Sequence, residues 1–198
     1  EAESGENIYL SLDSRLQKTA IEAFGTNSGA LVVMNVQTGE ILAYVSTPAF
    51  DPNLFVSGMD YKTWNEMVKN PKNPLADKAA SGVYSPGSTF KMITAIAGLH
   101  SGVIDLNTKI DCSGKFEYGN HAFHCWKHSG HGPLNVVEAL EHSCDVFFYE
   151  LALKIGIEKI AQTAHEFGLG EESGLRLPIE KSGIIPDKAW KMRRFGQK

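Results

Sequence analysis

The sequence is short of cysteine, of net charge and of long apolar runs, and each shortage excludes a class of protein. Its three cysteines in 198 residues are an odd number, so disulfide bonds alone cannot form its framework. The formal net charge of -4 provides no basic surface of the kind that binds nucleic acid. No apolar run approaches the length of a membrane-spanning helix, and residues 1–6 do not read as a signal peptide.

The remaining composition predicts a folded domain. With 42% hydrophobic residues, the chain can form one core, or one core and a small satellite. Residues 7–12 alternate and predict a strand, and residues 15–24 predict an amphipathic helix capped by Asp13 or Ser14. Two β-rich runs, 30–36 and 41–46, flank a short turn with a glycine and predict a hairpin. Strands and a long helix together indicate an α+β domain.

The later part of the chain is expected to be mostly helical. Four prolines interrupt residues 47–84, which we interpret as a long surface excursion that forms part of a cleft wall. Residues 111–132 are rich in glycine, histidine and cysteine, and few of them can join a core. Apolar spacing predicts helices at residues 64–69, 90–99, 133–141, 146–155 and 157–167.

The segment with the most chemistry is the one around Ser88, which follows a Pro-Gly turn and precedes an apolar helix. Lys91 lies one helical turn further on and faces the same way. A serine hydroxyl is a weak nucleophile until a base takes its proton, and a lysine can do so only when burial keeps its amine neutral. The helix N-terminus adds free N–H groups that suit an anionic intermediate. The alternative for an isolated Ser-x-x-Lys is a helix cap and a surface lysine.

The three cysteines lie close together in the sequence with five of the seven histidines. Cys112, Cys125, Cys144 and His131 would complete the four-ligand set that structural zinc prefers. We select His131 because a glycine on either side lets its backbone approach closely, with His124 as the alternative. The spacing matches no standard zinc finger. Two other interpretations stay open, namely small buried hydrophobic cysteines, or one disulfide with one free thiol.

Three patterns taken together resemble the transpeptidase domain of class B penicillin-binding proteins. Residues 86–91, Pro-Gly-Ser-Thr-Phe-Lys, match the first motif of that family. Residues 143–145, Ser-Cys-Asp, match its second motif, Ser-x-Asn/Asp. Residues 39–43 with Pro52 and Asn53 match its typical hairpin and turn. The resemblance runs from about Ile8 onward.

Within this family the chain looks most like the cell-elongation branch, penicillin-binding protein 2. That resemblance rests on the aspartate at position 145, on Gly-His-Gly at 130–132 and on residues 183–187. It implies an α+β penicillin-binding/serine-β-lactamase-like fold, an antiparallel sheet packed with helices plus a mainly helical lobe, incomplete at its C-terminal side. The expected divisions are a flexible lead at 1–6 and one partial transpeptidase domain at 7–198, with a strand-helix-hairpin part, a cleft-wall insertion and a catalytic helical lobe at 7–47, 48–84 and 85–198.

The activity implied by the resemblance is peptidoglycan D,D-transpeptidation in cell-wall elongation. Ser88 would attack the penultimate D-alanine carbonyl of a stem peptide, with Lys91 as the base. Ser143 would relay a proton, and Asp145 would hold Lys91 or orient the substrate. No cofactor is required, β-lactams would acylate Ser88, and a zinc ion would brace the catalytic loop from behind.

The third motif of the family, Lys-Thr/Ser-Gly, does not occur in the sequence, and the nearest string, Lys18-Thr19-Ala20, lies on the first predicted helix. We therefore expect a fragment without the family's membrane anchor and pedestal, and no turnover by this chain alone. The implied location is the bacterial periplasm, anchored to the inner membrane, with stem peptides, β-lactams and elongation-complex proteins as partners. The alternatives are a β-lactam-sensing module, a serine β-lactamase and a non-enzymatic zinc interaction domain.

Overall fold

A computed structural model describes residues 5–196 of the chain. The described residues form two compact units, the first made of residues up to Gly82 with 176–181, the second of 83–175 with the residues from Ser182 onward. The elements of the first unit are α1 (Ser14–Phe24), β1 (Gly29–Met34), β2 (Ile41–Thr47), α2 (Asn53–Val56), α3 (Tyr61–Lys69) and α4 (Lys78–Ser81). Those of the second are the 3-10 turn η1 (Gly87–Phe90), α5 (Lys91–His100), β3 (Ile110–Cys112), β4 (Lys115–Tyr118), β5 (His121–His124), β6 (Gly132–Leu134), α6 (Val136–Glu141), α7 (Asp145–Ile155), α8 (Ile157–Glu166) and α9 (Lys188–Phe195).

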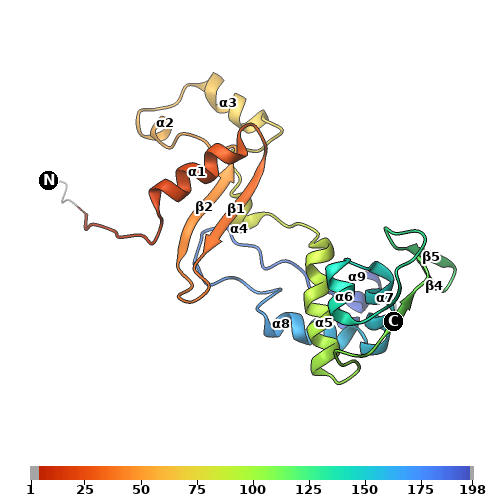
Figure 1. The fold of residues 1–198 in the computed structure, drawn as a ribbon. Coiled ribbons are helices and arrows are strands. Elements are labelled where there is room, and N and C mark those ends of the chain that lie inside the picture. Colours follow the sequence, from red (N-terminus) through yellow and green to blue (C-terminus); the bar gives the residue numbers. More distant parts are fainter. Residues whose placement is uncertain (1–4, 197–198) are drawn as a thin grey trace. The chain divides into compact units, whose positions relative to one another are not determined.

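The first unit is organised around the predicted hairpin of β1 and β2. The two strands pair antiparallel, and α1 lies across the hairpin (Figure 1). Asp13 caps α1 as predicted, because its carboxylate accepts the N–H groups of Arg15 and Leu16. The Gln17 side chain joins α1 to β2, since its amide donates to the Tyr44 carbonyl and accepts the Tyr44 N–H.

The predicted strand at residues 7–12 is wrong. These residues are irregular and exposed, and the side chain of Tyr9 keeps 92% of its accessible surface. The Ser11 hydroxyl and the Asp13 N–H reach the carbonyls of Ile41 and Leu42, but a strand needs a full ladder along a neighbouring edge. Of the predicted flexible lead at 1–6, residues 1–4 lie outside the described part of the chain.

The excursion at residues 47–84 contains three short helices, of which the sequence predicted one. That one, α3, starts three residues earlier than expected, because Asp60 caps it by accepting the Thr63 N–H. Rings of Phe50, Phe55 and Trp64 meet edge to face and hold α2 near α3. The role of this excursion as a cleft wall stays a prediction.

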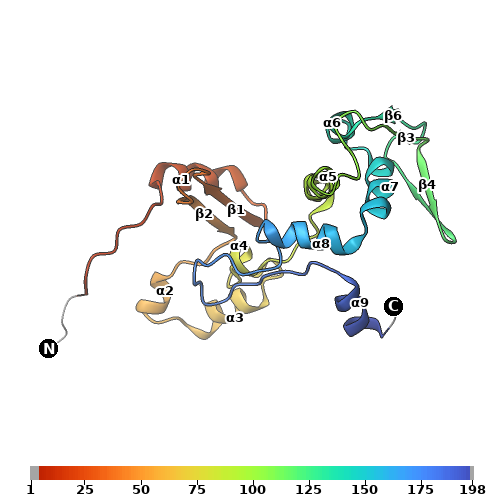
Figure 2. The same cartoon turned by 90° about the horizontal axis from the view of Figure 1, so that it is seen from below.

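The core of the second unit lies where α5 and α8 pack against α7. Phe147 and Leu151 of α7 are fully buried in it. Helices α5 and α7 approach closely at Gly98, where an added Cβ would come within 3.1 Å of Leu151. Figure 2 shows α5 nearly end-on beside α7.

The glycine- and histidine-rich region of the second unit forms short strands. Strand β3 pairs with β6, and β4 with β5, so a segment with few apolar residues is held by two small ladders. Helix α6 begins at a capping box made by Asn135 and Glu138, three residues later than the predicted helix at 133–141. Helix α9 was not predicted; Asp187 caps it by accepting the Trp190 N–H.

None of the helices among residues 5–196 has the length and apolar character that crossing a membrane requires.

Candidate active site

Ser88 and Lys91 lie at the start of the buried helix of the second unit. The predicted helix at 90–99 is α5, but its first turn is the 3-10 turn η1, so Ser88 precedes the α-helix proper. The Lys91 N–H donates to the Ser88 carbonyl, which closes that turn. Ser88 is exposed, whereas the side chain of Lys91 keeps only 12% of its accessible surface. An exposed hydroxyl therefore stands one turn before a largely buried amine.

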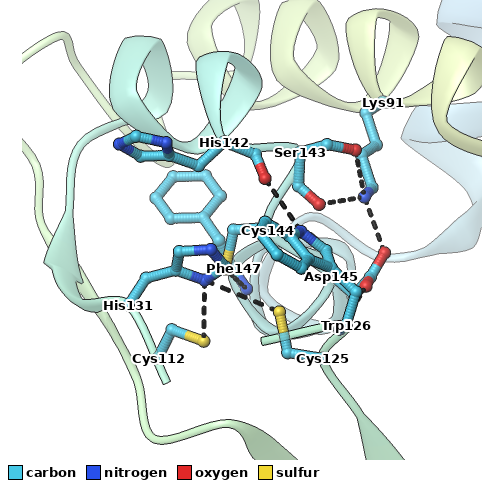
Figure 3. A network of polar contacts seen from close by, with 10 residues as sticks. All are labelled: Lys91, Cys112, Cys125, Trp126, His131, His142, Ser143, Cys144, Asp145 and Phe147. Atoms are coloured by element: carbon cyan, nitrogen blue, oxygen red, sulfur yellow. Dashed lines mark hydrogen bonds and ion pairs between the residues drawn. The ribbon is translucent and has the colours of Figure 1, made fainter. Parts of the chain in front are cut away.

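The amine of Lys91 points at the second motif. Its Nζ donates to the carbonyl oxygen of Ser143 at 2.7 Å, to Oγ of the same residue at 3.1 Å and to Oδ1 of Asp145 at 2.6 Å (Figure 3). These partners lie more than fifty residues further along the chain, where α7 begins. The structure thus brings three of the four predicted catalytic residues into direct contact, with Ser88 one turn away.

These contacts match the three N–H donors of an ammonium group. A neutral amine has two N–H groups and one lone pair, so it can donate to the Asp145 carboxylate and the Ser143 carbonyl and accept from the Ser143 hydroxyl. Because a hydroxyl rotates and is both donor and acceptor, Ser143 fits either charge state of Lys91. The arrangement can therefore hold the lysine charged or neutral without moving a heavy atom.

Ser143 itself has an unusual backbone. Its φ of 48° lies in the left-handed region, which residues with a side chain rarely adopt. This conformation turns both its carbonyl and its hydroxyl toward Lys91. Backbone bonds from Ser143 to the Leu140 carbonyl and from Cys144 to the Ala139 carbonyl hold the turn from the side of α6. Strain that surrounding structure maintains in this way is typical of functional sites.

Three contacts of this network were not predicted from the sequence. The backbone N–H of Trp126 donates to Oδ2 of Asp145 at 3.2 Å, and its indole Nε1 donates to the His142 carbonyl at 3.0 Å. The ring of Phe148 lies 5.8 Å from Nζ of Lys91, within the range of a cation–π contact. The only signal in the sequence is that Trp126 adjoins Cys125, in a region with few other large apolar residues.

The predicted metal ligands also come together. One ligand atom from each of Cys112, Cys125, His131 and Cys144 lies within 4.8 Å of every other. The three cysteines are buried free thiols. The alternative ligand, His124, is exposed and pairs with the ring of His128 instead.

The geometry of this cluster fits a tetrahedral ion. Nδ1 of His131 lies 3.5 Å from Sγ of Cys112 and 3.6 Å from Sγ of Cys125. A zinc ion with bonds of about 2.3 Å to sulfur and about 2.0 Å to nitrogen separates these atoms by about 3.5 Å at the tetrahedral angle. Three thiols and one imidazole are also a donor set typical of structural zinc. The residues present therefore fit such an ion.

Glycine lets two segments of the cluster cross closely, as the choice of His131 assumed. Gly130 has φ +79°, and a Cβ there would lie 2.2 Å from the carbonyl oxygen of Cys112. The His131 N–H donates to that same carbonyl at 2.9 Å. Gly132 also has positive φ, but nothing lies within 4 Å of a Cβ at that position. Of the two glycines beside His131, close approach is thus required at Gly130 and not at Gly132.

Burial and backbone donors set different protonation tendencies within the cluster. Burial raises the pKa of Cys144 to about 12. Burial also acts to raise the pKa of Cys125, but backbone N–H groups at Lys127, Asp145 and Val146 outweigh it and hold that pKa below its ordinary value. Burial lowers the pKa of His131, which favours the neutral ring that a metal ligand must have.

Comparison with known proteins places this site in a family. Residues 29–197 match the family model described as penicillin binding protein transpeptidase domain. The peptidoglycan D,D-transpeptidase MrdA of Acinetobacter baumannii is 44% identical over 191 residues, which are 96% of this chain and 28% of that protein. The chain thus spans less than a third of the length of this relative.

Two solved structures have the same fold. Pseudomonas aeruginosa PBP2 in complex with WCK 5153 is 36% identical, with a TM-score of 0.90 over 95% of this chain and 43% of that one. Helicobacter pylori PBP2 in complex with MreC is 41% identical, with a TM-score of 0.90 over 94% of this chain and 35% of that one. The predicted α+β transpeptidase fold is thereby confirmed, and the chain belongs to the penicillin-binding protein transpeptidase family.

Proposed function

We propose that this chain carries the acylation site of a peptidoglycan D,D-transpeptidase that acts in cell-wall elongation. The observation that carries the proposal is the contact of Lys91 with Ser143 and Asp145, one turn after an exposed Ser88. The two motifs of the family therefore meet at one amine. Similarity to a protein named peptidoglycan D,D-transpeptidase MrdA supports the same activity.

In the proposed first step, Oγ of Ser88 attacks the penultimate D-alanine carbonyl carbon of a stem peptide. The hydroxyl proton passes to neutral Lys91, and a backbone N–H group at the start of η1 donates a hydrogen bond to the oxyanion. The C–N bond to the terminal D-alanine then breaks, and its amine takes the proton from Lys91 by way of the Ser143 hydroxyl. In the second step an amine of a neighbouring stem peptide attacks the ester carbonyl carbon and gives a proton to Lys91. The C–O bond to Ser88 then breaks, and Lys91 passes that proton to Oγ, which restores the Ser88 hydroxyl and neutral Lys91.

The contacts of Lys91 explain why the second motif is needed for this chemistry. The buried amine loses a proton only if its neutral form is also stabilised. The Ser143 hydroxyl supports that form by donating to the lone pair, while Asp145 and the Ser143 carbonyl retain the two N–H groups. This arrangement supports the proposed roles of Ser143 as proton relay and Asp145 as anchor of Lys91.

The direct test of this proposal is covalent labelling by a fluorescent penicillin, because a β-lactam resembles the D-Ala-D-Ala end and should acylate Ser88. In the intact protein that contains this chain, Ser88→Ala should abolish labelling, while Ser85→Ala, a change of another exposed serine of the same segment, should leave it intact. Labelling of the Ser88→Ala variant at the parent rate would contradict the assignment. Rapid nitrocefin hydrolysis would favour a serine β-lactamase instead.

We further propose that Cys112, Cys125, His131 and Cys144 bind a structural zinc ion. The four converging ligand atoms and the close backbone crossing at Gly130 support this site. The ion would take no part in the acyl transfer. It would hold Cys144, the middle residue of the second motif, and thereby brace the segment that carries Ser143 and Asp145.

Metal analysis of protein purified without added zinc tests this second proposal. We expect about one zinc per chain and no reactive thiol until a chelator is added. One free thiol and no metal would show a disulfide between the other two cysteines and contradict the zinc site.

We infer that the partners and location are those of an elongation enzyme. The H. pylori relative was solved in complex with MreC, so we propose a protein of that kind as a partner, besides stem peptides and β-lactams. The proposed location is the periplasmic side of the inner membrane. Co-purification of the intact protein with its own MreC, compared with an unrelated membrane protein, tests the partner.

A further inference from the structure

Trp126 contacts the segment that carries the second motif at two points. Its backbone N–H donates to Oδ2 of Asp145, and its indole Nε1 donates to the backbone carbonyl of His142. Ser143 and Cys144 lie between these two points (Figure 3). Trp126 keeps 63% of its accessible surface, so packing in the core does not account for its position.

One of the two residues between these bonds, Ser143, has a strained backbone conformation. Ser143 adopts positive φ, and this conformation directs its carbonyl and its hydroxyl to Nζ of Lys91. A conformation that a residue with a side chain rarely adopts has to be maintained by its surroundings. Bonds to Ala139 and Leu140 hold the turn from α6, and the indole bond to His142 holds it from the opposite segment.

The position of Trp126 is itself fixed by its neighbours. It follows Cys125, whose N–H donates to the Gly114 carbonyl at 2.9 Å. Its ring meets the ring of His131 edge to face, with centroids 5.3 Å apart. These two contacts fix the position of the Trp126 ring. Through its bond to the His142 carbonyl, the indole N–H therefore restrains the backbone just before Ser143.

We propose that Trp126 is a positioning residue, whose indole N–H holds the Ser143 turn in the orientation that keeps Ser143 on Lys91 and thereby speeds acylation of Ser88. It acts through Ser143 and does not touch the substrate. This inference rests on the proposed function, because it concerns the rate of the same acyl transfer.

The test compares acylation rates of the intact protein that contains this chain. Fluorescent penicillin at several concentrations gives the rate constant of acylation and the dissociation constant of the non-covalent complex separately. Trp126→Phe keeps a ring and removes the N–H, so we expect the rate constant to fall about five- to tenfold, the effect of one hydrogen bond. The dissociation constant should stay within about twofold of the parent value.

The matched control is Trp190→Phe, which makes the same chemical change at a partly exposed tryptophan of α9. It should leave both constants unchanged. If Trp126→Phe does not melt cooperatively, β-(3-benzothienyl)alanine at position 126 replaces it, since this analogue keeps the shape of the indole and lacks only the N–H. The same fall in rate is expected.

Two results would overturn the inference while leaving the proposed function intact. An unchanged acylation rate constant would show that the indole bond does not position Ser143. A weaker non-covalent complex with an unchanged rate constant would show that Trp126 contacts the substrate instead. Failure of the parent protein to be acylated at all would instead overturn the proposed function, and this inference with it.

Discussion

At the scale of single residues, Lys91 determines what the site can do. Its amine touches both residues of the second motif that were predicted to be catalytic. It lies 2.6 Å from a carboxylate and on the face of an aromatic ring, in surroundings that keep most water away. A charged lysine is therefore well held by its neighbours, and its proposed role as the base of the acylation step can be tested directly.

Replacing Lys91 by arginine separates its charge from its ability to lose a proton. Lys91→Arg keeps the ion pair with Asp145, but a guanidinium does not deprotonate in proteins and cannot act as a base. We expect the acylation rate constant to fall about 10²- to 10⁴-fold, the usual contribution of a general base. Fluorescent penicillin labelling measures this fall, and circular dichroism verifies the fold. Acylation within a factor of three of the parent would contradict the role of Lys91 as a base.

The sequence was sufficient to find the residues that belong to short motifs. Ser88 with Lys91, and Ser143 with Asp145, are each recognisable within a few positions of each other. Trp126 could not be found, because its contacts are with residues 16 and 19 positions away and depend on a crossing of two loops. The positive φ of Ser143 was equally hidden, since serine shows no general preference for that conformation.

At the scale of elements, local signals predicted helices better than strands. The Asp13 cap and the apolar spacing of α7 lie within the elements they define, and those predictions are confirmed. The strand predicted at residues 7–12 is wrong because a strand depends on a partner, which alternation alone does not supply. The short strands β3 to β6 were missed for a related reason, since backbone pairing rather than apolar pattern defines them.

Side-chain bonds of Tyr44 and Ser46 tie helix α4 to the hairpin of the first unit, and the Tyr44 bond can be removed without other changes. The Tyr44 hydroxyl donates to Oδ2 of Asp77 at 2.9 Å, and Asp77 also caps α4 through Oδ1. Tyr44→Phe should lower the free energy of unfolding by about 1 kcal/mol, the usual net value of such a bond. Urea unfolding measures the change, with Tyr61→Phe, at an exposed tyrosine, as the control.

The same bond predicts a dependence on alkaline pH. Burial and then the Asp77 carboxylate raise the pKa of Tyr44 above its ordinary value of 10.0, so the folded state holds the phenol proton longer than the unfolded state. The stabilising contribution of the Tyr44–Asp77 bond is complete below pH 10. It is lost as the pH rises from there toward the pKa of Tyr44 in the folded state. Tyr44→Phe should flatten this alkaline loss, and an equally steep loss in the variant would contradict the assignment.

The loop crossing at Gly130 predicts a sharp difference between two neighbouring glycines. Gly130→Ala places a Cβ 2.2 Å from the Cys112 carbonyl, and at positive φ, so the cluster cannot keep its geometry. Gly132→Ala has a similar φ but meets nothing within 4 Å, and should cost only about 1 kcal/mol of backbone strain. We expect Gly130→Ala to lose the bound metal and Gly132→Ala to retain it. Equal metal content in both variants would contradict the crossing.

At the scale of the whole molecule, the chain divides into two units with different means of stabilisation. The first has a hairpin covered by α1, and the second has a helical core around Phe147 and Leu151. The cysteine and histidine region of the second unit supplies little apolar surface apart from the cysteines themselves, so a metal ion would add stability there that packing does not. A boundary between the insertion and the helical lobe was predicted at residues 84 and 85, but no pattern in the sequence places residues 176–181 in the first unit.

Removal of the metal should therefore destabilise the second unit and leave the first. A chelator should lower its melting temperature by on the order of 15 °C, if the ion contributes about 4 kcal/mol. Acidification should release the ion, because protons compete with it for the three thiolates and the imidazole. Metal affinity therefore falls as the pH falls. Tryptophan fluorescence of single-tryptophan variants that keep Trp64 or Trp126 follows each unit. Unfolding of both units together on chelation would contradict a local role.

The central claim is that Ser88, activated through Lys91 by the second motif, forms an acyl-enzyme. Its most direct measurement is mass spectrometry of the intact protein after reaction with benzylpenicillin, followed by peptide mapping. Our account predicts one adduct per chain, of the full mass of the β-lactam because the ring opens without a leaving group, located on Ser88. An adduct on another residue, or no adduct on the folded parent protein, would contradict it.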